Sequence, residues 1–83
     1  MTTEELKNIA VANTVDARGT SCPGPLLAAK KAIGEIESGE ILEVLSADEG
    51  TKLDIPRWCN KMEHEFLGII DEDSYSRLFL KKA

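Results

Sequence analysis

Hydrophobic and polar positions alternate early in the chain and then change period. Residues 11–16 place two valines and an asparagine on one side, which predicts a first strand. From residue 26 onward the apolar spacing becomes three and four, which is one face of a helix. The residues on that face are Leu26, Ala29, Ile33 and Ile36. The pair Ser38-Gly39 is expected to end this helix.

A second helix is predicted after a mostly buried strand over residues 40–46. The stretch Thr51-Lys52-Leu53-Asp54 has the form of a capping box, and Ile55, Cys59 and Met62 then share one face. Pro56 removes a hydrogen bond inside such a helix. The helix therefore begins either at Asp54, with Pro56 in its first turn, or at Thr51 with some irregularity, and we favour Thr51.

The last third of the chain predicts a hairpin. Residues 66–70 and 75–81 are apolar strand segments separated by the acidic turn at 71–74, a connection too short for anything but antiparallel pairing. The whole order is β-α-β-α-β-β. It predicts an α/β two-layer sandwich in which a four-stranded mixed sheet carries two helices packed on one face.

This single domain is expected to span residues 11–82, with residues 1–10 as an N-terminal tail. The tail is polar and lacks a clear apolar face. Thr2 or Thr3 can cap one helical turn, so the sequence leaves both an ordered and a disordered tail open.

Composition narrows the function classes. The chain has 83 residues, 42% hydrophobic and 30% charged, which is typical of one globular domain. Its net charge of −5 argues against nonspecific binding to nucleic acid or to a membrane. No apolar run is long enough to span a bilayer, and the acidic start does not resemble a secretory signal. We therefore expect a cytoplasmic monomer.

The two cysteines are the most reactive groups of the chain. With a single His they are too few for a four-ligand zinc site, so no metal and no cofactor are predicted. In a reducing compartment they are expected to be free thiols. Cys59 lies on the apolar face of the second helix and is predicted to belong to the core. Trp58 is predicted to be a packing residue at the edge of that helix rather than a binding platform. His64 beside Glu65 is predicted to be a surface pair.

Cys22 is the candidate reactive residue because it stands at the predicted mouth of the first helix. A helix N-terminus stabilises a thiolate and lowers the pKa of its cysteine. Pro23, Gly24 and Pro25 shape that mouth, and the prolines remove two N–H donors, so the expected lowering is moderate. Position 25 is Pro, which excludes a Cys-x-x-Cys redox motif. A functional thiol and an inert, poorly capping cysteine both remain open on this reasoning.

Four cations are expected near this end of the sheet. They are Arg18, Lys52, Arg57 and Lys61. On an otherwise acidic chain they predict a basic rim around Cys22 that docks a partner protein. Asp16 is expected to order the loop before the cysteine through backbone hydrogen bonds.

These residues resemble the TusA/SirA-like sulfur-carrier family. Cys22-Pro23-Gly24-Pro25-Leu26 is similar to its CPxPxL signature, and Asp16-Ala17-Arg18-Gly19 to the D-x-x-G-x-x-C lead-in. The segments 54–59 and 62–65 resemble its second helix. The family's variable motif position is Gly24 here, where a tRNA-thiolation member can carry Glu, so the resemblance favours that branch less.

The resemblance implies a sulfurtransferase component of a relay rather than a stand-alone enzyme. Cys22 would accept sulfane sulfur as a persulfide from a cysteine desulfurase or a rhodanese-like protein. It would pass that sulfur to an acceptor relay protein, for tRNA thiolation, cofactor sulfuration or sulfur oxidation, without binding nucleic acid directly. The alternative is a redox-sensing or regulatory module in which a partner reads the oxidation state of Cys22.

Overall fold

The computed structural model describes residues 2–20 and 24–83. Within those ranges the elements, in chain order, are α1 (Thr3–Asn8), β1 (Asn13–Asp16), α2 (Gly24–Ile33), β2 (Ile41–Ser46), α3 (Thr51–Met62), β3 (Glu65–Asp71) and β4 (Ser76–Lys81). No helix in the described ranges is long and apolar enough to cross a membrane.

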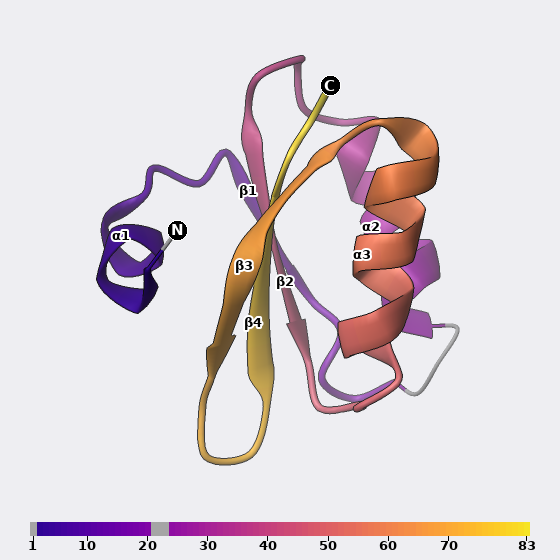
Figure 1. Ribbon diagram of the computed structural model, residues 1–83. Coiled ribbons are helices and arrows are strands. Elements are labelled where there is room, and N and C mark those ends of the chain that lie inside the picture. Colours follow the sequence, from indigo (N-terminus) through magenta and orange to yellow (C-terminus); the bar gives the residue numbers. More distant parts are fainter. Residues whose placement is uncertain (1, 21–23) are drawn as a thin grey trace.

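The four strands form one mixed sheet in the order β1-β2-β4-β3. The β1 and β2 strands are parallel, with Val15 opposite Val44, and the other neighbouring pairs are antiparallel. Helices α2 and α3 lie together on one face of this sheet (Figure 1). The predicted two-layer sandwich is therefore confirmed.

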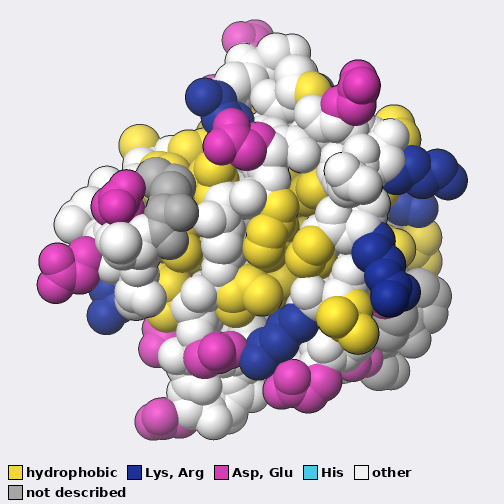
Figure 2. Space-filling model, viewed as in Figure 1, with side chains coloured by type: hydrophobic (Ala, Val, Ile, Leu, Met, Phe, Trp, Pro, Cys, Tyr) yellow, Lys and Arg dark blue, Asp and Glu magenta, His cyan; other side chains and the backbone are white. Residues whose placement is uncertain are grey.

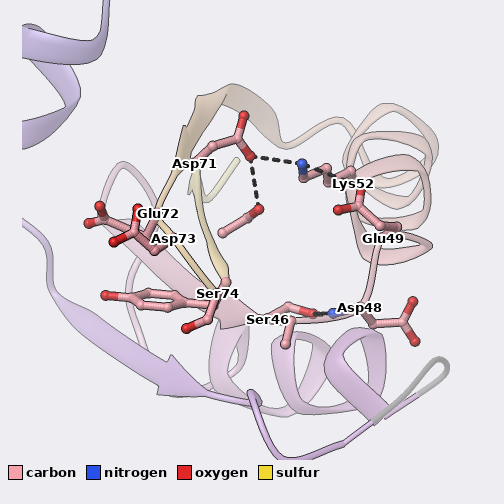
Figure 3. Close-up of a pocket in the computed structure, with 11 residues that line it drawn as sticks. Ser46, Asp48, Glu49, Lys52, Asp71, Glu72, Asp73 and Ser74 are labelled. Carbon is pink, nitrogen blue, oxygen red and sulfur yellow. Dashed lines mark hydrogen bonds and ion pairs between the residues drawn. The ribbon is translucent and has the colours of Figure 1, made fainter.

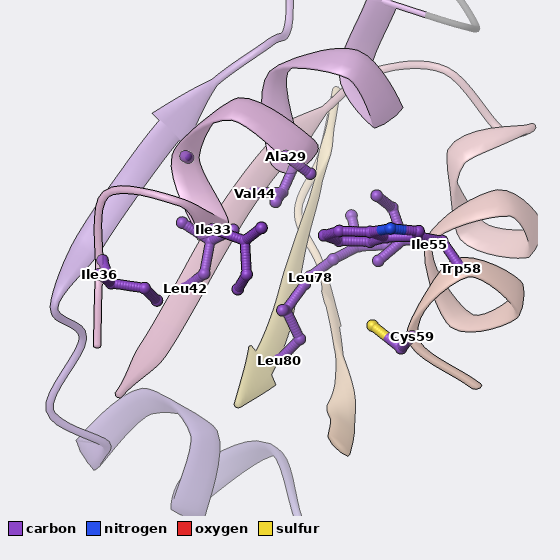
Figure 4. Close-up of a cluster of buried hydrophobic side chains, with 11 residues drawn as sticks. Ala29, Ile33, Ile36, Leu42, Val44, Ile55, Trp58, Cys59, Leu78 and Leu80 are labelled. Carbon is purple, nitrogen blue, oxygen red and sulfur yellow. The ribbon is translucent and has the colours of Figure 1, made fainter. Parts of the chain in front are cut away.

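The main core fills the space between the sheet and these two helices (Figure 4). Its buried members are Ala29, Ala32, Ile33, Ile36, Leu42, Val44, Ile55, Trp58, Cys59, Leu78 and Leu80. Figure 4 shows the Trp58 ring reaching from α3 toward the α2 side and the sulfur of Cys59 pointing into the cluster. Cys59 is a core residue, as predicted from its face of the second helix. Trp58 packs as predicted, but it belongs to the core rather than to the helix edge.

A third helix, α1, covers the opposite face of the sheet and is absent from the predicted element order (Figure 1). Its capping box joins Thr2 and Glu5, and Leu6 is its one buried residue. Leu6 packs with Ile70 and Phe79 in a second, smaller apolar cluster. Burying a leucine contributes on the order of 1.5–3 kcal/mol, which anchors this short helix to the sheet.

The first predicted helix is too long. α2 ends at Ile33, not near Ser38, because Gly34 and Glu35 donate to carbonyls only three residues back, at Lys31 and Ala32, and the chain turns away. Gly34 is a poor helix residue at that point. The turn still leaves Ile36 buried in the main core, so the apolar spacing correctly indicated a core position there but not helix.

The predicted start of the second helix at Thr51 is confirmed, with Pro56 inside α3, but the predicted capping box is wrong. Gly50 is the N-cap, and no side chain caps the helix. The Thr51 hydroxyl is buried instead and accepts a hydrogen bond from Ser46 Oγ at 2.9 Å. This buried contact ties the start of α3 to the end of β2.

Gly68 lies where Leu6 of α1 packs closely against the sheet. It sits at a bulge in β3 with φ 154°, and an added Cβ would lie 2.9 Å from Leu6 Cδ1. We expect Gly68→Ala to lower the free energy of unfolding by about 1–3 kcal/mol, measured by urea denaturation.

Gly19→Ala is the matched control for that variant. Nothing lies within 4 Å of the Cβ it would add, so its effect should stay within about 0.5 kcal/mol. Equal stability of the two variants would contradict the packing of α1 against β3.

Candidate functional site

The start of α2 is the part of the fold that flanks the predicted reactive cysteine. Helices α2 and α3 both begin at the carboxyl ends of the parallel strands, α2 after β1 and α3 after β2 (Figure 1). Cys22 and Pro23 lie outside the described residues. The site is therefore built from the residues on either side of them, in the loop after β1 and in the first turn of α2.

Asp16 and Arg18 order the loop that precedes this position. The Arg18 backbone N–H donates to Asp16 Oδ1 at 3.2 Å, and its guanidinium donates to both carboxylate oxygens at 2.9 and 2.8 Å. The side-chain hydrogen bonds from Arg18 are the main cause that lowers the pKa of Asp16 to about 2. The predicted hydrogen bond between the Asp16 carboxylate and the loop backbone is thus confirmed, with Asp16 as the acceptor, and the carboxylate stays charged near neutral pH.

Thr20 and Gly24 bring the two ends of this loop into contact. The Thr20 hydroxyl donates to the Ala17 carbonyl at 3.0 Å, and a Cβ added at Gly24 would lie 2.8 Å from both Thr20 Cβ and Oγ1. Pro25, next along, is fully buried. Gly24 is therefore required by close packing at the mouth of α2, which gives its place in the motif a physical reason.

The predicted basic rim separates into two groups. Arg18 is paired with Asp16 and also lies over the Tyr75 ring, 4.9 Å from its centroid. Lys52 is paired with Asp71 at 2.8 Å and Glu49 at 3.4 Å. Arg18 and Lys52 are therefore both neutralised by carboxylates within the fold.

Arg57 and Lys61 form the other group and make no ion pair with any residue that the structure describes. They lie together beside α2, next to Lys30 and Leu26. Sequence reasoning did not select Lys30. Its signal was present, since it follows Leu26 by one helical turn.

The carboxylates around Lys52 line a hollow of about 260 Å³ at the same end of the sheet (Figure 3). Asp71 accepts from both Lys52 and Ser76, and these hydrogen bonds, the one from Lys52 first, lower the pKa of Asp71. The lining is mostly polar, with Ala47 and the Tyr75 ring as its less polar members. Among the described residues, no three His, Cys, Asp or Glu side chains come together as metal ligands.

His64 lies at the end of α3 that is remote from the mouth of α2. Its Nδ1 accepts a hydrogen bond from the Ala83 backbone N–H at 3.0 Å, and its ring meets Trp58 edge-on at 5.3 Å. A general base must reach the proton it removes. This position is consistent with a structural role for His64.

Cys59 is a free thiol that the core encloses. It is 1% exposed, and burial raises its pKa to about 11. The thiolate is the reactive form of cysteine, so Cys59 is chemically quiet in the folded protein.

The fold and this site define a small α/β domain in which hydrogen bonds order residues 16–20 ahead of a helix mouth and one cysteine is buried in the core. The family model described as Sulfurtransferase TusA matches residues 13–82, and the chain belongs to this family. That membership supports a sulfur-carrier role.

Individual relatives agree with this assignment. The chain is 47% identical over 68 residues to the "Putative sulfur carrier protein" of Archaeoglobus fulgidus, covering 82% of this chain and 93% of the relative. It is 40% identical over 69 residues to YrkI of Bacillus subtilis strain 168, which carries the same description, with 83% and 92% covered. The crystal structure of a SirA-like protein from Desulfitobacterium hafniense superposes with a TM-score of 0.74 at 25% identity, covering 83% and 95%.

The burial of Cys59 predicts its reactivity. In a Cys22→Ser variant at neutral pH, alkylation of Cys59 by iodoacetamide should be slower in the folded than in the urea-unfolded protein by at least roughly a hundredfold. The rise in pKa to about 11 alone accounts for this factor, because the reagent attacks the thiolate. Mass spectrometry of timed samples measures both rates, and similar rates would show that Cys59 is accessible.

The contact between Thr20 and Gly24 predicts that substitutions at these two positions have non-additive effects on stability. Gly24→Ala should destabilise the protein by about 1–3 kcal/mol, although Ala is the better helix residue, because its Cβ overlaps Thr20. In a Thr20→Gly background the same change should cost less, since the overlapping atoms are gone. A double-mutant cycle in urea measures the coupling, and additive effects would contradict the contact.

Proposed function

We propose that the chain carries sulfane sulfur as a persulfide on Cys22, taking it from a donor protein and giving it to an acceptor thiol. The observation that carries this proposal is the contrast between the two cysteines of a chain in the TusA family. Cys59 is sealed in the core with a raised pKa. Cys22 is the only other thiol in the sequence, and it lies within the matched residues 13–82, in the segment that resembles the family's CPxPxL signature.

The transfer step needs no outside oxidant. The Cys22 thiolate attacks the outer sulfur of the donor's persulfide, the donor's S–S bond breaks, and the donor leaves as a thiolate. One new S–S bond forms, so Cys22 becomes a persulfide while the number of S–S bonds stays the same. Attack by an acceptor thiolate on the outer sulfur of that persulfide then returns Cys22 as a thiolate.

The described residues support this chemistry by fixing the loop and the helix that flank Cys22. The Asp16–Arg18 pair and the contact between Thr20 and Gly24 fix the loop on α2. The N-terminus of α2 favours a nearby negative charge, which lowers the pKa of a thiol placed there. A pre-ordered loop also reduces the entropy lost when a partner protein docks.

The proposed relay partners are those that the resemblance to the family implies. The donor is a protein that forms a persulfide, either a cysteine desulfurase or a rhodanese-like protein. The acceptor is a relay protein with a reactive thiol, on a path to tRNA thiolation, cofactor sulfuration or sulfur oxidation. In this role the chain is a cytoplasmic sulfurtransferase component that binds proteins in turn.

Intact-mass measurement tests the proposal. The protein is incubated with a cysteine desulfurase and cysteine, and separately with a rhodanese and thiosulfate, and its mass is recorded. We expect a gain of one sulfur atom with at least one donor, abolished in Cys22→Ser and retained in Cys59→Ser.

Cys59→Ser is the matched control because it removes the other thiol. Sulfur retained in Cys22→Ser would overturn the assignment of the site. Absence of sulfur with both donors, together with rapid sulfenylation of Cys22 by peroxide, would favour the redox-sensing alternative.

A further inference from the structure

A groove with an apolar floor and a cationic rim runs between α2 and α3. We define the α2–α3 groove by the residues Leu26, Lys30, Ile33, Asp54, Arg57, Trp58, Lys61 and Met62. Its wider part, toward the end of α3, has a volume of about 350 Å³. Apolar side chains from both helices floor it, and Met62 is 53% exposed at its rim.

The basic side chains of this groove differ in their ion pairing from three other cations of the fold. Arg18, Lys52 and Arg77 are each held by carboxylates. The three groove cations, Lys30, Arg57 and Lys61, have no ion pair within residues 2–20 and 24–83. They therefore converge on one surface of a protein whose net charge is −5. Asp54 is the one carboxylate among the described residues that line the groove.

The surface view agrees with this distribution. Figure 2 shows Lys and Arg side chains along the side of the molecule where α2 and α3 lie, and carboxylates along the lower edge near the β3–β4 hairpin. Cations left unpaired beside apolar surface are the arrangement that a partner of opposite charge completes. An isolated apolar patch would lack this preference for one sign of charge.

We propose that the α2–α3 groove binds an acidic segment of a relay partner protein, with an apolar side chain of that segment seated over Trp58. This proposal rests on the proposed sulfur-carrier function for the identity of the partner. The acidic side chains pair with Lys30, Arg57 and Lys61. The apolar floor adds burial that the ion pairs alone do not supply.

The position of the groove relates docking to sulfur transfer. Leu26 and Arg57 line its near end, and Leu26 is in the first turn of α2. The two helices run in the same direction, so the groove leads from this turn toward Ile33 and Met62. A segment bound along it holds the partner at the end of the molecule where the motif of Cys22 meets α2.

Trp58 makes the groove directly observable. It is the only tryptophan of the chain, and it lines both parts of the groove. The probe is a short synthetic peptide in which glutamates flank a Leu-Leu pair, titrated into the full chain while the Trp58 fluorescence is recorded. A second peptide with lysines in place of the glutamates is the charge control.

Lys31→Glu is the matched control for Lys30→Glu. Lys31 is the next residue of α2, is exposed, makes no ion pair with a described residue and lies outside the groove, so both variants change net charge equally. We expect saturable binding of the acidic peptide that weakens as salt is added. Lys30→Glu and Lys61→Glu should each raise its Kd by about tenfold or more, and Lys31→Glu by less than about twofold.

Three results would overturn the groove proposal. They are the absence of a saturable signal, equal binding of the lysine peptide, or an equal loss of affinity in Lys31→Glu and Lys30→Glu. The sulfur-loading experiment on the unmodified chain fails or succeeds independently. Peptide binding without loading would sink the carrier function alone, and loading without peptide binding would sink the groove alone.

Discussion

The parallel pairing of β1 with β2 is the constraint from which the arrangement of this protein follows. Parallel neighbours cannot be joined by a tight turn, so the chain must cross over through a helix, which is α2. That crossover begins at the carboxyl end of β1, and α3 begins at the carboxyl end of β2. Both helices therefore start at the same end of the sheet and run in the same direction. Without that common start, no groove could lead to the mouth of α2.

The same geometry separates the charges of an acidic chain. The loops that follow β2 and β3 meet at one end, where carboxylates surround Lys52 and hold it in ion pairs. The cations of the α2–α3 groove lie on the helix side of the sheet and form no ion pair with those carboxylates. Charge pairs within the fold contribute little to stability at the surface. Leaving Lys30, Arg57 and Lys61 unpaired thus costs the folded protein little and keeps them available for a partner.

Periodicity predicted the sandwich because the residues that alternate or repeat also decide which side chains enter the core. It predicted Cys59 as a core residue for the same reason, but it assigned Trp58 to the helix edge although the ring is buried. It could not predict α1, since a helix held by the single buried side chain of Leu6 has no repeat to detect. The capping box at Thr51 failed because the hydroxyl found a buried partner, Ser46, that lies on another element.

The candidate site shows a similar division between local and tertiary information. The ordering role of Asp16 was predictable because its partner lies two residues away. The sequence did not predict which cations would form ion pairs. Lys52 is held by Asp71 across the fold, whereas Lys30 has no carboxylate partner among the described residues. The tight contact that requires Gly24 depends on the path of the loop back to Thr20. The spacing of residues in the sequence does not predict the path of that loop.

The burial of Cys59 bears on how a carrier with two cysteines keeps its sulfur on one of them. A persulfide is attacked by any thiolate that reaches its outer sulfur, so a second accessible thiol would divert the sulfur away from an acceptor. Here the core denies Cys59 both requirements, since burial raises its pKa and encloses its sulfur. Reaching it would require α3 to separate from the sheet, which exposes Ile55 and Trp58 and costs the burial energy of the main core. In the proposed function, the packing that stabilises the fold thus also keeps Cys59 from competing with an acceptor thiol for the sulfur.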